Sequence, residues 1–105
     1  MIKTSVSLGV SFALPDRLTV DQLDDYQTRI GEYLSAYKNT FLSTARYRAM
    51  AYSAAVESNL IADWTCEAMP ELRPADVGQA DARVIGFVGK EIDDYITAYT
   101  TISPN

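Results

Sequence analysis

The stretch SVSLGVSFALP, residues 5–15, decides the fold class of this sequence. Its larger apolar residues stand at every second position, and small residues occupy the positions between them. The apolar set is Val6, Leu8, Val10, Phe12 and Leu14. This alternation predicts a β-strand over residues 4–14 with one buried face. The remainder of the chain offers no second stretch of equal quality, so the strand has no evident pairing partner.

A single strand cannot satisfy its own backbone N–H and C=O groups, and three arrangements remain open. The stretch can fold back as a hairpin around Gly9, although it lacks a turn dipeptide typical of hairpins. It can pair with the β-branched tail TTIS, residues 100–103. It can also pair with another chain, by strand exchange between copies or by addition to a partner's sheet edge. The third arrangement is favoured, because an exposed alternating strand is otherwise an aggregation hazard.

Two long stretches after the strand predict helices. The first covers residues 20–37 and begins at a capping box, in which Thr19 is the cap and Gln22 the third helical residue. Its apolar residues then recur every three or four positions, as on one face of a helix. The second covers residues 40–64, is rich in alanine, and contains neither glycine nor proline.

An acidic, proline-containing loop is predicted over residues 65–78, and a third helix over residues 79–99. Gly86 and Gly89 interrupt the third helix on one face, where they allow another backbone to approach closely. The sequence therefore predicts a single domain over residues 1–105. Its expected fold class is mainly α, with three helices and a short N-terminal β element, either a strand or a hairpin.

The charges and the missing residue types exclude several classes of function. The chain has 14 acidic and 9 basic residues, a net charge of −5 and no histidine. Direct binding to nucleic acid is not expected, because phosphate contacts need clustered lysine and arginine. Histidine-dependent nucleophilic sites and the usual zinc sites are ruled out as well. Cys66 stands in an acidic stretch and is expected to be a core residue rather than a nucleophile. We therefore expect a non-enzymatic protein without cofactor or metal.

The cysteine count and the hydropathy pattern bear on location. One cysteine allows no internal disulfide, which fits a reducing cytoplasm. No apolar run has the length of a membrane span. The serine-rich start without a terminating A-x-A site favours a strand over a signal peptide. The expected location is the cytoplasm, that of the host cell if the protein is encoded by a phage, without membrane contact.

The order of elements, with FALPDRLTV (residues 12–20) and DWTCEAMPEL (residues 63–72), resembles small phage tail-assembly chaperones and related phage accessory proteins. The resemblance implies a cytoplasmic, non-enzymatic factor that self-associates and binds an aggregation-prone tail protein. It assigns no functional residue.

The expected function is therefore protein interaction, as a phage-type tail-assembly chaperone that forms a homo-oligomer. The alternative is a small acidic inhibitor, similar to anti-CRISPR proteins, that blocks a basic nucleic-acid-binding surface of a host defence complex. The expected partner is thus a protein, either a phage structural protein or a host complex. The residues expected to bind it are Val6, Leu8, Val10, Phe12, Glu67, Glu71, Asp76 and Asp81.

Overall fold

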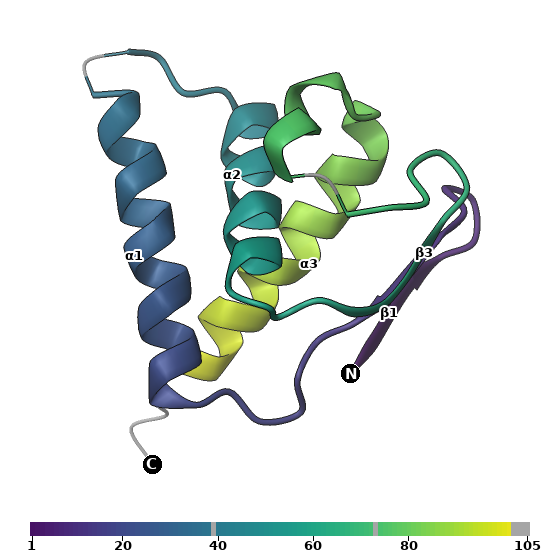
Figure 1. Cartoon of the computed structure of the whole chain (residues 1–105), viewed down its shortest axis with the longest axis horizontal. Helices are drawn as coiled ribbons and strands as arrows, with labels where there is room; N and C mark the ends of the chain where they lie inside the picture. Colours follow the sequence, from purple (N-terminus) through teal and green to yellow (C-terminus); the bar gives the residue numbers. More distant parts are fainter. Residues whose placement is uncertain (39, 73, 102–105) are drawn as a thin grey trace.

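The computed structural model describes residues 1–38, 40–72 and 74–101, and for residues 74–76 it describes the backbone alone. The elements in chain order are β1 (Ile2–Ser5), β2 (Val10–Ala13), α1 (Val20–Ala36), α2 (Thr44–Glu57), β3 (Ala62–Cys66), the 3-10 helix η1 (Pro74–Gln79) and α3 (Ala82–Thr100). In Figure 1 α2 and α3 lie between α1 and the sheet, and none of the helices in the described ranges covers the far face of the sheet. The predicted mainly α class is wrong, because the described strands form a three-stranded antiparallel sheet in a small α+β fold.

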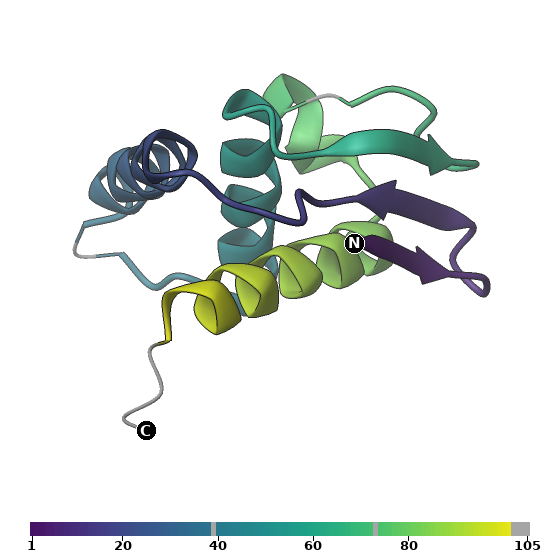
Figure 2. The ribbon, with the colours of Figure 1, turned by 90° about the horizontal axis from the view of Figure 1, so that it is seen from below.

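The predicted strand over residues 4–14 is a hairpin, and β2 is the central strand of the sheet (Figure 2). Ser5 pairs with Val10 at the turn end of the hairpin. The turn spans four residues, and the Gly9 nitrogen donates to the Val6 carbonyl at 3.2 Å. Gly9 has φ +65°, a conformation that costs glycine little. The sequence lacks the dipeptide typical of a two-residue turn, whereas a four-residue turn needs no signature dipeptide.

The pairing partner of β2 on its other side is β3, a strand that is not among the predicted elements. The predicted second helix ran to residue 64, but α2 ends at Glu57. Asn59 follows in the left-handed conformation with φ +59°. Its N–H donates to Val56 O, and the next N–H, that of Leu60, donates to Ala55 O. These two bonds form a Schellman motif, which ends a helix and redirects the chain.

An aromatic cluster joins the sheet to the helices. Phe12 of β2 has no exposed surface, and its ring centroid lies 6.1 Å from that of Trp64 and 6.4 Å from that of Phe87. Trp64 also contacts Tyr52 of α2, at 6.0 Å between ring centroids. The apolar face of β2 is therefore part of the core, and its partner groups come from the same chain.

Two local predictions, on the start of α1 and on the glycines of α3, are confirmed in full or in part. The capping box of α1 is confirmed, and the helix boundaries agree with the predicted range to within one residue. The close approach predicted on α3 holds for Gly89, where an added Cβ would lie 2.4 Å from the Arg48 carbonyl oxygen. Gly86 has no such neighbour within 4 Å. The tail residues 102 and 103, proposed as a pairing partner, lie outside the described residues.

Candidate partner-binding surface

The four apolar residues expected to bind a partner do not share one surface. Val10 and Phe12 are buried in the core, with 2% and 0% of their surface exposed. Leu8 is half-buried and packs against the core, whereas Val6 is 91% exposed at the tip of the hairpin. The expectation that this strand seeks its hydrogen-bonding partner outside the chain is wrong, because β1 and β3 flank β2 on both sides.

Two of the predicted acidic residues do lie together. Glu71 and Asp81 line one open cleft of about 430 Å³, between the loop after β3 and the start of α3. Glu67 lies beside this loop, at the end of β3, where its N–H donates to the Gly9 carbonyl at 3.2 Å. Asp76 belongs to η1, but its side chain lies outside the described part of the chain.

The lining of this cleft combines acidic and apolar groups. Besides the two carboxylates, the lining includes Met69, Pro70 and Ala80. The indole nitrogen of Trp64 donates to the Met69 carbonyl at 2.7 Å and holds the loop against the core. A lysine or arginine side chain has an apolar stem and a cationic head, so it matches such a lining. The sequence indicated the carboxylates but not their apolar neighbours, which only the folded loop brings together.

Asp81 also has a structural role, because it caps α3. Its carboxylate accepts hydrogen bonds from the backbone nitrogens of Arg83, at 2.8 Å, and Val84, at 3.4 Å. The hydrogen bond to the Arg83 side chain is the main cause that lowers the pKa of the Asp81 carboxyl, and the two backbone hydrogen bonds lower it further. Asp81 is therefore ionised at neutral pH, and its replacement would disturb the helix as well as the surface.

Cys66 is buried, as predicted, and forms no disulfide. Within the described ranges, no group of three or more histidine, cysteine or acidic side chains could hold a metal ion. The resolved pKa shifts of carboxyl groups, at Asp16 and Asp81, are both downward and keep these groups ionised. Neither group is thus poised as a general acid near neutral pH.

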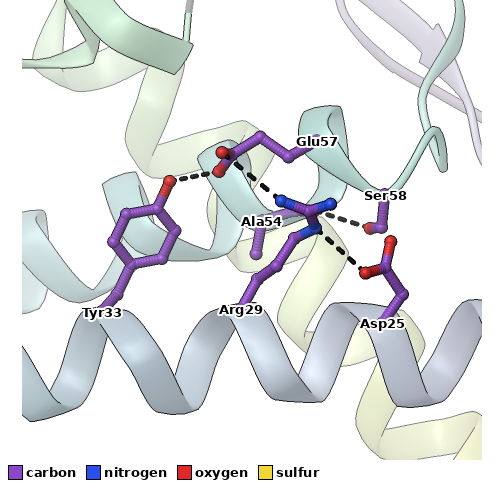
Figure 3. A network of polar contacts seen from close by, with 6 residues as sticks. All are labelled: Asp25, Arg29, Tyr33, Ala54, Glu57 and Ser58. Atoms are coloured by element: carbon purple, nitrogen blue, oxygen red, sulfur yellow. Dashed lines mark hydrogen bonds and ion pairs between the residues drawn. The ribbon is translucent and has the colours of Figure 1, made fainter.

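A polar network fastens α1 to the C-terminal end of α2 (Figure 3). Arg29 lies between two carboxylates, with its Nε atom 3.2 Å from Asp25 and its Nη1 atom 3.7 Å from Glu57. The Tyr33 hydroxyl donates to the Glu57 carboxylate. Arg29 is thereby engaged within the chain, and the network holds helices together rather than forming a site.

Burial of tyrosine hydroxyls predicts that the fold loses stability in alkali. Desolvation, together with the Glu57 carboxylate, raises the pKa of Tyr33 from 10.0 to about 12. Desolvation also raises the pKa values of Tyr26, Tyr47 and Tyr95. The unfolded chain releases these protons first, so the stabilisation is fully present below pH 10 and declines as the pH rises toward about 12.

We expect the urea midpoint to fall between about pH 8 and about pH 11, and the fall to be smaller in Tyr33→Phe, which cannot ionise. Circular dichroism during urea titration measures both. A midpoint that stays constant over this range would contradict the expectation.

A second open groove, also of about 430 Å³, lies between β1 and the C-terminal half of α3. Its lining includes Lys3, Asp16, Glu91, Asp94, Tyr95 and Tyr99. None of these residues was placed in a site from the sequence. The groove lies where β1, an edge strand of the sheet, passes beside α3. The sequence predicts one strand over residues 4–14, so it does not predict β1 as a separate strand or this groove.

Comparisons with known proteins add no identification: family models, curated sequences and solved structures all gave no match. The resemblance to tail-assembly chaperones therefore stays a prediction. Among the described helices, none combines the length and the apolar character needed to cross a bilayer.

Proposed function

We propose that this protein is a non-catalytic protein-interaction factor that binds a basic partner through its acidic surface. The observation that supports this function best is the cleft lined by Glu71 and Asp81, whose apolar lining suits the stem of a lysine or arginine side chain. Glu67 extends the negative charge to the adjoining end of the sheet. A net charge of −5 attracts such a partner from a distance.

The chemistry of the partner follows from the same charges. A surface rich in lysine and arginine is what nucleic-acid-binding proteins present to phosphate groups. An acidic protein that occupies this surface competes with the nucleic acid for it. The proposal therefore extends to an inhibitor of a host nucleic-acid-binding complex, in the manner of the anti-CRISPR proteins.

Tail-assembly chaperoning with self-association is the second candidate. Three exposed apolar side chains favour it, namely Ile2 at 76%, Val6 at 91% and Phe41 at 88% of their surface. Exposed apolar groups suit a hydrophobic client. An unpaired strand does not support this candidate, because β2 is paired on both sides. Binding to a hydrophobic client would survive high salt, whereas binding through charge would not.

Neutralising the cleft carboxylate of Glu71 together with the neighbouring Glu67 tests the first candidate. The probe is a fluorescent ten-residue polyarginine peptide, and the variant is Glu67→Gln/Glu71→Gln, which leaves the helix cap Asp81 intact. We expect its affinity at about 0.15 M salt to be lower by about fivefold, since each exposed ion pair contributes a fraction of a kcal/mol to about 1 kcal/mol. Fluorescence anisotropy measures the dissociation constants.

A control variant with the same net charge distinguishes the effect of these two positions from the effect of net charge. Asp24→Asn/Glu32→Gln removes two exposed carboxylates from α1 instead. We expect it to weaken binding by less than about twofold, because screening limits the reach of distant charges. Equal weakening in both double variants would show that the peptide responds to net charge alone, and the proposed binding surface would be wrong.

A further inference from the structure

The outer edge of β1 presents unpaired backbone groups. The Leu14 nitrogen donates to the Met1 carbonyl at 2.8 Å, which sets the hydrogen-bonding phase of the hairpin. The backbone N–H and C=O groups of alternate residues in an antiparallel strand point toward the same neighbouring strand. The backbone groups of Lys3 and Ser5 therefore point toward β2. The backbone groups of Ile2 and Thr4 therefore point away from the sheet, and within the described ranges no other segment forms backbone hydrogen bonds with them.

The two edge strands of the sheet differ in the features that prevent further strand pairing. Edge strands usually carry a charge, a proline or a bulge that prevents further pairing. β3 carries a bulge with the exposed residue Asp63 in the left-handed conformation, at φ +53°. β1 has neither proline nor bulge, and its single charge belongs to Lys3, whose Nζ atom lies 3.5 Å from Glu91. An inward-pointing lysine can itself prevent further strand pairing. Here the ion pair with Glu91 reduces the free-energy cost of burying the Lys3 charge under an added strand.

The groove beside β1 continues from this open edge. A strand added to β1 would place alternate side chains over the C-terminal half of α3, where Tyr95 and Tyr99 line the groove. Tyr99 is 44% exposed. The remaining side chains of the added strand would lie on the outer face, beside Ile2 and Thr4.

The carboxylates of the groove suit a basic occupant. Asp16, Glu91 and Asp94 line it together with two cations, the Lys3 side chain and the N-terminal ammonium group of Met1, which lies 2.8 Å from Asp16. Asp94 also pairs with Lys90 at 2.7 Å. These pairs are partly or largely exposed, and exposed ion pairs are weak enough to exchange partners. A guanidinium group can also stack on an exposed tyrosine ring.

We propose that β1 accepts an extended segment of a partner protein as a fourth strand, in which basic residues facing α3 alternate with β-branched residues on the outer face. This inference rests on the proposed function, since it gives the same basic partner a second point of attachment.

Two peptides of equal composition test this directly. One alternates arginine and valine over eight residues, and the other carries the arginines and valines in separate blocks. We expect the alternating peptide to bind at least about fivefold more tightly, since only alternation places all the charges on one face of a strand. We expect Glu91→Gln/Asp94→Asn to remove this preference and Glu67→Gln/Glu71→Gln to retain it. Fluorescence anisotropy gives all affinities.

Backbone pairing is tested without altering the protein. The alternating peptide is prepared with N-methyl groups on its valines or, separately, on its arginines. Only alternate amides of an added strand face β1, so one of the two peptides should lose the preference and the other should keep it. Equal binding of the alternating and block peptides, or of the two methylated peptides, would overturn the proposal. A stable dimer of the chain that excludes the peptide would also overturn it.

These outcomes separate the two proposals. Polyarginine binding that depends on Glu67 and Glu71, without any preference for alternation, would refute strand addition and leave the proposed function in place. If the alternating peptide is preferred but polyarginine binding follows net charge alone, the proposed function would be refuted and strand addition would be supported.

Discussion

Gly89→Ala is expected to lower the free energy of unfolding by at least about 2 kcal/mol, because overpacking a buried contact costs about 1–3 kcal/mol or more. The added Cβ would lie 2.4 Å from the Arg48 carbonyl oxygen and 2.8 Å from the Arg48 Cα atom. These are backbone atoms of α2, so the contact is relieved only when the two helices move apart. The expected loss exceeds the gain of up to about 1 kcal/mol that alanine brings to a helix.

Gly86 provides the matched control in the same helix. A Cβ at this position meets no atom within 4 Å, so Gly86→Ala should stabilise the chain by up to about 1 kcal/mol through helix propensity. Urea unfolding followed by circular dichroism measures both variants. If the two changes shift the midpoint in the same direction, the close packing of α3 on Arg48 is wrong.

Phe12→Ala is expected to lower the free energy of unfolding by about 3–5 kcal/mol, the usual cost of removing a buried aromatic ring. The ring has no exposed surface and contacts Trp64 of β3 and Phe87 of α3. Its removal therefore leaves a cavity between the sheet and the helices. The same urea titration measures this loss, and a variant too unstable to purify can be compared through Phe12→Leu.

Val6 provides the control on the same hairpin. It belongs to the same alternating stretch but is 91% exposed, so Val6→Ala should change the stability by no more than about 0.5 kcal/mol. Similar effects of the Phe12 and Val6 changes would contradict the placement of β2 in the core. The contrast also separates a core strand from a binding strand, since a binding strand would tolerate both changes in the free chain.

The helices could be predicted where local signals mark both their faces and their ends. The capping box at Thr19 and Gln22 fixed the start of α1, because it depends only on residues close in sequence. The end of α2 was missed although Asn59, a residue tolerant of the left-handed conformation, stood there. The alanine-rich composition extends the helical pattern past Asn59, so the sequence predicts helix where β3 forms.

The sheet could not be predicted because its pairing connects segments far apart in sequence. β3 is irregular, with a bulge opposite β2, and therefore lacks the alternation that marks a half-buried strand. Without β3, the sequence pattern predicts that the apolar face of β2 binds a partner instead of packing in the core. The sequence indicates the acidic cleft in part, since Glu71 and Asp81 lie only ten residues apart in the chain, but the groove beside β1 depends on the register of the hairpin.

The central claim is that the chain binds a basic partner segment at the open edge of β1. Titrating the ¹⁵N-labelled chain with the alternating arginine–valine peptide, and following every backbone amide by NMR, tests it most directly. We predict the largest shift changes at Ile2, Thr4 and Tyr99, with hydrogen-exchange protection gained at Ile2 and Thr4. Changes confined to amides distant from β1, or none at all, would contradict the claim.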